Sequence, residues 1–233
     1  MILKRAFLVF LGLFLFTVSI VWAGDSAFFV DLGFSPDGRH YTFAQYGVRT
    51  DTLKPWADMF VVDVARNNFV SGGRIAYIHN KPIEAGQDGT GALYHVIAKN
   101  AGIVERHNVS YANQGQPLYI ALSGDPAYEG TAITFRDFIS GIFYQTTLIE
   151  TIRGTGKDTR SSFYIKLEST DNDGEKKSYT VGTLGLERPG IFSYRIKKVL
   201  IDSSGSSLIF VIEMKRWSEQ GHDIRYMVEA VRL

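Results

Sequence analysis

Residues 32–64 read LGFSPDGRHYTFAQYGVRTDTLKPWADMFVVDV, and this stretch decides the fold. Around it, the apolar residues of segment 28–34 alternate with smaller or polar ones, which places one set of side chains on one face of a strand. Pro36 and Asp37 suit a type I turn, and Gly38 can take the positive φ that closes a hairpin with a bulge. The chain returns over residues 40–46 and continues, after a polar loop, as a β-branched segment at 59–64. The stretch therefore predicts an antiparallel meander.

A similar pattern returns near the C-terminus, where an apolar run at 199–201 meets a turn ending in Gly205 and two further apolar runs follow. An offset of 167 positions sets Gly38 on Gly205 and Phe43 on Phe210 without a gap. Self-similarity of this kind is typical of internal duplication, although two copies make neither a solenoid nor a propeller. The alternative is that two common meanders share their turn and apolar positions by chance.

The first 23 residues have the pattern of a signal peptide. Lys4 and Arg5 form a basic start, residues 6–20 are almost entirely apolar, and Val21-Trp22-Ala23 has the small final residue that signal peptidase prefers. We expect cleavage between Ala23 and Gly24, which leaves residues 24–233 as one β-rich secreted domain. The alternative is an uncleaved anchor, because residues 6–23 are about long enough to span a bilayer.

Composition restricts the chemistry and the partners. The chain has no cysteine, which excludes disulfides, cysteine nucleophiles and thiolate metal sites, and in an exported chain favours a bacterial envelope. The formal net charge is +1, and removing the two signal-segment cations leaves 23 basic against 24 acidic residues. This balance argues against nucleic acid as a partner and, after signal cleavage, against a membrane.

The rest of the chain reads as short strands separated by turns. Apolar residues at helical spacing predict one short helix over 90–101, with Gly102 as its C-cap, after a loop-like region at 72–91. Strand candidates lie at 118–122, 131–138, 143–152, 163–168 and 178–183. The sequence therefore predicts a mainly β fold: a single antiparallel β-rich domain of meander sheets, arranged as a sandwich or as propeller-blade-like units, with one short helix.

The opening unit resembles a known family. With the run 33–38 (GFSPDG), Phe43, Tyr46-Gly47 and Val62-Asp63-Val64, it is similar to bacterial proteins known only as predicted secreted proteins with a domain of unknown function. The same turn also resembles the blade turns of WD40-like and TolB-type propellers. Family members often carry cysteines in the second half, and this chain has none. The resemblance implies export and a β-rich fold, and it brings no activity.

No motif of the sequence carries recognisable chemistry. The five histidines show no metal-ligand pair at i, i+2 or i, i+4 spacing, so we expect no metal site and no cofactor: His40, His79, His95, His107 and His222. Asp171-Asn172-Asp173-Gly174-Glu175 lacks the distal glutamate of a calcium loop and is more typical of a hairpin turn. The nucleophile motif Gly-x-Ser-x-Gly is absent from the sequence, and we assign no catalytic residue.

Two tryptophans are the candidate binding residues. Trp56 and Trp217 each follow the second strand of a meander unit and are flanked by Lys54 and Arg216, so they could form a surface for carbohydrate or peptide. The alternative is that each ring tucks under its own loop.

Two functions follow from these observations. The first is a periplasmic or secreted protein that binds or scaffolds an unknown envelope component, either protein or glycan, without catalysis. The alternative is a hydrolase of envelope polysaccharide or peptide, with carboxylates drawn from several strands; it requires two carboxylates about 5 to 9 Å apart in one cleft.

Overall fold

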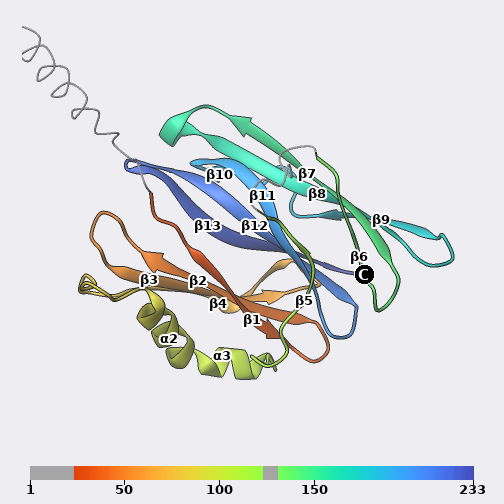
Figure 1. Ribbon diagram of the computed structural model, residues 1–233, viewed down its shortest axis with the longest axis horizontal. Coiled ribbons are helices and arrows are strands. Elements are labelled where there is room, and N and C mark those ends of the chain that lie inside the picture. The colour runs from red at the N-terminus through yellow and green to blue at the C-terminus, as the bar shows by residue number, and fades with distance from the viewer. Residues whose placement is uncertain (1–23, 123–130) are drawn as a thin grey trace, which may run out of the picture.

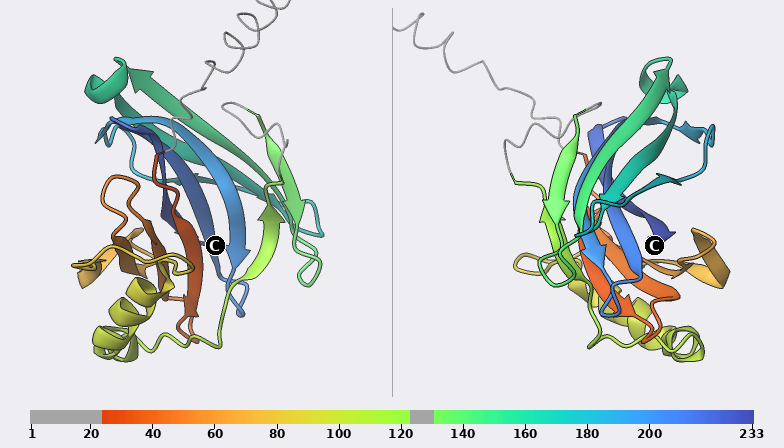
Figure 2. Two further views of the ribbon diagram at one scale, coloured as in Figure 1. Left: turned by 60° about the vertical axis from the view of Figure 1, so that its left-hand side comes forward. Right: turned by 90° about the vertical axis from the view of Figure 1, so that its right-hand side faces the viewer.

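The computed structural model describes residues 24–122 and 131–233, so Ala23 and the predicted signal segment lie outside the described residues. The described chain forms three antiparallel sheets and two α-helices (Figure 1). The mainly β prediction is thereby confirmed. The helices cover one face of the first sheet, whose other face packs on the middle sheet, and the outer sheet covers the far side of the middle sheet (Figure 2).

The first sheet is a meander in the order β1-β2-β3-β4. Its strands are β1 (Phe28–Phe34), β2 (His40–Val48), β3 (Pro55–Asp63) and β4 (Asn68–Ile78). The middle sheet has the order β13-β12-β11-β5. It contains β5 (Gln116–Ile120), β11 (Ile191–Ile201), β12 (Ser207–Ser218) and β13 (Gly221–Arg232).

The outer sheet has the order β10-β8-β7-β6, with β9 also paired to β8. Its strands are β6 (Ile133–Arg136), β7 (Phe143–Arg153), β8 (Arg160–Thr170), β9 (Lys176–Val181) and β10 (Arg188–Pro189), and a 3₁₀ turn, η1 (Gly156–Asp158), connects β7 to β8. The helices α2 (Thr90–Lys99) and α3 (Ala101–Arg106) lie between β4 and β5 in sequence.

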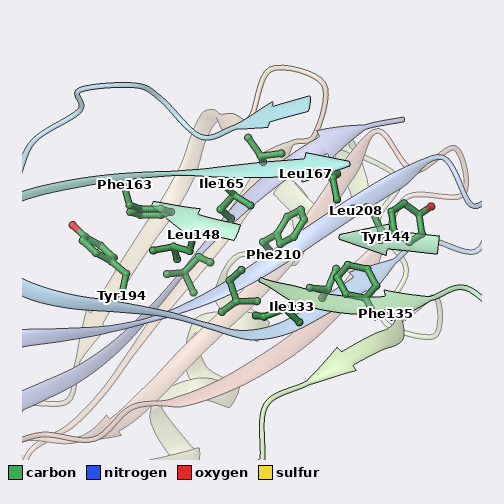
Figure 3. Close-up of a cluster of buried hydrophobic side chains, with 14 of the residues drawn as sticks. Ile133, Phe135, Tyr144, Leu148, Phe163, Ile165, Leu167, Tyr194, Leu208 and Phe210 are labelled. Carbon is green, nitrogen blue, oxygen red and sulfur yellow. The ribbon is translucent and has the colours of Figure 1, made fainter. Parts of the chain in front are cut away.

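The middle sheet is buried on both faces, which explains the uninterrupted apolar run in β12. Leu208, Phe210 and Ile212 pack toward the outer sheet, whereas Ile209 and Val211 pack toward the first sheet. All five are 0% exposed. Figure 3 shows the outer cluster, in which Ile165 of β8 lies near Phe210, and Phe163 of β8 packs on Tyr194 of β11 with the ring centroids 4.4 Å apart. A strand with two apolar faces is typical of the centre of a layered fold.

The two similar sequence units form two similar meanders, one in the first sheet and one in the middle sheet. The meanders are stacked so that their equivalent faces point in the same direction, toward the outer sheet. The hairpin pairs Gly33↔Thr42 and Leu200↔Ile209 are related by the offset of 167. The offset maps Tyr41 and Phe43, which face the middle sheet, onto Leu208 and Phe210, which face the outer sheet. The second hairpins differ in register by two residues, because Phe43 pairs with Phe60 whereas Phe210 pairs with Glu229 rather than Met227.

The turns of the two meanders lie side by side. Gly38 (φ +65°) donates its backbone N–H to Ser35, and Gly205 (φ +70°) donates to Asp202 in the same manner. Ser207 Oγ donates a hydrogen bond to the carbonyl of Gly38 at 3.0 Å. A Cβ on Gly38 would lie 2.5 Å from a carboxylate oxygen of Asp202, so only glycine permits this close approach.

Three local elements differ from the sequence prediction. Residues 72 and 73, predicted as loop, lie inside β4, and β3 begins at Pro55 rather than at residue 59. The predicted helix ends at Lys99 and is followed by a second helix, α3, which contains Gly102. Helix α3 forms because Val104 packs against the same apolar face of the first sheet as α2, and this tertiary contact outweighs the local glycine signal.

Candidate functional site

A cleft of about 690 Å³ lies at the edge of the first sheet. It lies between the end of β4, the loop 79–89 and the first half of α2. The loop is held in place by backbone hydrogen bonds from His79 to Pro55 and from Ile83 to Leu53, both 2.8 Å. Gly89 lies so close to Gly47 that a Cβ would be 2.6 Å from the Gly47 carbonyl oxygen, which fixes the start of α2 against β2.

A tyrosine and two histidines form one wall of the cleft. The Tyr77 hydroxyl lies 2.9 Å from Nδ1 of His79, two residues along the same strand face. The ring of His95 on α2 stacks on Tyr77 with the ring centroids 4.2 Å apart. Tyr77 and His79 are half-buried and His95 is exposed. The wall therefore presents a phenol and two imidazoles, each able to donate and accept hydrogen bonds.

Charged and polar groups line the opposite side of the cleft. They come from the loop 79–89 and include Lys81, Glu84, Gln87 and Asp88. Asp88 Oδ1 accepts hydrogen bonds from the Thr90 hydroxyl (2.5 Å) and the Thr90 N–H (2.9 Å) at the start of α2. These bonds stabilise the carboxylate and lower the pKa of Asp88. Asp88 is thus an ionised group bonded to the first residue of α2, and a general acid would need the opposite shift of its pKa.

The described residues do not bring together any group of three His, Asp or Glu side chains suited to a metal ion. His79 and His95 both line the cleft, and both contact Tyr77. The chemistry that this arrangement supports is recognition of a polar ligand, because aromatic and imidazole rings offer flat contact area beside donors and acceptors.

The two candidate tryptophans lie in strands rather than in loops. Trp56 is in β3 and is only 5% exposed, with the guanidinium of Arg225 4.4 Å from its ring centre. Trp217 is at the end of β12, half-buried, and pairs with His222 of β13. The buried ring of Trp56 leaves little surface for a ligand, because Arg225 covers it.

The other predicted site residues lie where the chain begins and turns. Pro36 and Asp37 are exposed in the β1–β2 turn. Gly24, the expected first residue after cleavage, packs against β13, where a Cβ would lie 2.4 Å from the His222 carbonyl. Asp25 then pairs with β13 through the hydrogen bond from Ile224 N–H to its carbonyl, 2.8 Å. The start of the described chain is thus fixed to the middle sheet.

A buried ionic network holds this segment. Arg225 Nη2 lies 3.1 Å from Asp25 and 3.4 Å from Asp223, and all three side chains are at most 13% exposed. Arg216 approaches Asp223 at 2.7 Å, and Thr50 donates its N–H to Asp25 at 2.6 Å. Every member has a partner, as buried charges require. The network is structural, since it contributes nothing to the lining of the cleft.

We expect His107, whose ring lies beside that of His40, to make the stability depend on pH. The rings of His40 and His107 lie 4.6 Å apart where α3 meets the β1–β2 hairpin. Burial first, and then the neighbouring His40 and Arg106, lower the pKa of His107, while Asp63 opposes them. The folded state therefore binds a proton less readily than the unfolded state, and stability falls as the pH drops through the unfolded value of about 6.5.

We expect His107→Gln to reduce this acid sensitivity. Wild type should lose more unfolding free energy than the variant between pH 7.5 and pH 5.5, because glutamine cannot take up the proton. Urea titrations at both pH values measure the difference. Equal pH slopes in the two proteins would contradict the assignment of the sensitivity to His107.

The cleft residues were not found by sequence reasoning. Tyr77 and His79 stand at i, i+2 on one strand, but residues 72–91 read as loop, and His95 is 16 positions further on. The apolar stripe of the predicted helix was a signal in the sequence, because such a stripe indicates that the helix packs on a sheet. Only the packing of α2 against the first sheet brings His95 to Tyr77.

Comparison with known proteins identifies the family of the chain and assigns it no activity. A family model described as "Predicted secreted protein (DUF2259)" matches residues 42–232. No curated protein and no solved structure matches the chain. Among the described residues, no helix is long and apolar enough to cross a membrane. The chain belongs to this family of predicted secreted proteins, whose function is unknown.

Proposed function

We propose that this member of the predicted secreted family is a non-catalytic binding module that engages an envelope component through the Tyr77–His79–His95 cleft. The observation that supports the proposal is the cleft itself. It is about 690 Å³ in volume, the size of a small-molecule or oligomer subsite, and combines stacked rings with polar groups on the facing loop. The expected location is the periplasm or the medium, after cleavage between Ala23 and Gly24.

The chemistry of the cleft favours a glycan over a protein as the ligand. A sugar ring presents hydroxyl groups at its rim and C–H groups on its faces. Glu84 and Gln87 can accept hydrogen bonds from hydroxyls, and the imidazoles can donate or accept. The cleft is a concave site at one edge of the molecule, whereas a protein interface of standard size buries about 800 Å² on each partner.

Hydrolysis is the second candidate function, because two carboxylates, Glu84 and Asp88, line the same cleft. A glycosidase needs one of the pair protonated as general acid. The hydrogen bonds from Thr90 instead lower the pKa of Asp88 and keep it ionised. Asp88 could therefore serve only as the base or nucleophile of such a pair, and hydrolysis would need Glu84 as the general acid.

We expect His95→Ala to weaken ligand binding at least tenfold. The variant removes the ring that stacks on Tyr77, whereas the matched control Tyr94→Ala removes the adjacent ring, which is 68% exposed and does not line the cleft. Soluble fragments of cell-wall glycan serve as the probe, with binding followed by NMR shifts of the His79 imidazole, which lines the cleft and is retained in both variants.

The same incubation separates the two functions. Binding lost in His95→Ala, kept in Tyr94→Ala and accompanied by intact glycan supports the binding module. Shortened glycan chains that disappear with Glu84→Gln would establish hydrolysis instead. Equal binding by the two alanine variants would show that the cleft is not the site of binding.

A further inference from the structure

A second hollow, of about 270 Å³, lies on the exposed face of the outer sheet. Three directly opposed residue pairs of β7 and β8 line it: Ile149↔Tyr164, Thr151↔Ser162 and Arg153↔Arg160. At alternate positions of the two strands, Leu148 and Phe163 belong to the core, and Phe163 also borders the hollow together with Ser161. The loop that carries Leu184 and Glu187 closes one side of the hollow.

The two arginines stand opposite one another at the end of the hairpin. Like charges in directly opposed strand positions repel and destabilise a sheet. Lys157 and Asp158 in the connecting turn η1 add one further cation and one carboxylate to the same hairpin end. Glu187 lies 3.9 Å from Arg153, but both side chains are more than half exposed, so this ion pair is weak. The guanidinium of Arg160 donates to its neighbour's carbonyl, Thr159 O, at 3.0 Å.

Hydroxyl groups complete a lining that is rich in donors. Thr151 and Ser162 lie directly below the arginine pair, and Tyr164 follows on the same face of β8. Two guanidinium forks beside hydroxyl donors match a tetrahedral oxyanion, which accepts hydrogen bonds in several directions. An anion between the arginines would also replace their mutual repulsion by attraction.

We propose that this hollow binds a phosphate group, with Arg153 and Arg160 as its charged ligands and Thr151 and Ser162 as hydroxyl donors. A soluble phosphorylated sugar and a lipid headgroup share this chemistry. The site lies on the outer sheet, away from the cleft on the first sheet, so it is a second binding site that does not depend on the function proposed above. Glu187 competes with the phosphate for Arg153.

The test compares two double variants with the same change of charge. Arg153→Gln/Arg160→Gln alters the site, and Lys176→Gln/Lys177→Gln alters exposed positions of β9 in the same sheet. The probes for calorimetric and NMR titration of the whole exported protein are inorganic phosphate, glucose 6-phosphate and phosphatidylglycerol vesicles. We expect the arginine variant to bind at least tenfold more weakly and the lysine variant to stay within twofold of wild type. Glu187→Gln should bind severalfold more tightly.

Thermal unfolding shows whether the arginine variant is folded, so that a loss of phosphate binding can be assigned to the site itself. Without phosphate, the arginine variant should unfold at the wild-type temperature or slightly above it, because repulsion is removed from two exposed positions. With phosphate, only wild type and the lysine variant should gain stability. Binding of the two soluble probes but not of vesicles assigns the site to a phosphorylated solute. Binding of vesicles alone assigns it to a lipid headgroup, provided that the arginine variant loses this binding. Equal losses in the two double variants, or no binding of any probe by wild type, would overturn the proposal.

Discussion

Replacement of Phe210 by alanine is expected to lower the free energy of unfolding by about 3–5 kcal/mol, which is a large part of the stability of a typical domain. Phe210 is 0% exposed and lies in the central strand β12, where its ring packs between the middle and outer sheets (Figure 3). Hydrogen bonds join β12 to β11 on one side and to β13 on the other. The cavity left by the truncated side chain therefore cannot close by movement of β12 alone.

Urea unfolding followed by fluorescence measures the effect, with Phe138→Ala as the matched control. Phe138 is the same residue type but is 87% exposed in the β6–β7 turn, so its truncation should change stability by less than about 0.5 kcal/mol. The slope of free energy against urea should stay unchanged in both variants. A loss below about 1 kcal/mol for Phe210→Ala would contradict the layered packing described here.

Substitution of Arg225 by methionine is expected to cost a similar amount, about 3–5 kcal/mol, for an electrostatic reason. The variant removes the guanidinium that lies over the Trp56 ring and leaves Asp25 without its ion pair. Asp223 retains only Arg216. A buried carboxylate that loses its cation keeps its desolvation cost and gains nothing in return. The beginning of the chain at Asp25 should then detach from β13.

The control for this experiment is Arg39→Met, which breaks an exposed ion pair. Arg39 and Asp37 lie 3.6 Å apart with side chains 71% and 57% exposed, so the expected loss is at most about 1 kcal/mol. Hydrogen exchange at the amide of Ile224, which bonds to the Asp25 carbonyl, reports detachment directly. Unchanged protection of that amide in Arg225→Met would show that the network does not hold the segment.

Strand alternation and turn chemistry allowed most of the fold to be predicted. The hairpin around Gly38 and the strands β7 and β8 follow from patterns that are local in the chain. The strand β4 was missed because its residues are mostly exposed and include two glycines, so its sequence lacks the apolar alternation of a half-buried strand. Its backbone pairs with β3, and that pairing rather than side-chain burial determines its structure.

The proposed binding sites could not be predicted from the sequence for a different reason. Tyr77 and His95 belong to different elements, and their contact depends on how α2 packs on the first sheet. The sequence left open whether the Trp56 ring forms a binding surface or tucks under its own loop, and in the structure Arg225, 169 positions away, covers the ring. A residue's environment in a sheet protein is set by strands that are distant along the chain.

The sequence by itself determined the targeting signal pattern, the absence of cysteine chemistry, the mainly β class and the repeated turn at an offset of 167. These properties depend on side-chain type and on spacing along a few neighbouring residues. Only the tertiary structure decided which face of each meander is covered, that two turns 167 residues apart touch, and that a tyrosine and two histidines share one cleft. The physical reason is that stacking and burial are contacts between distant segments, and no local pattern encodes which segments will meet.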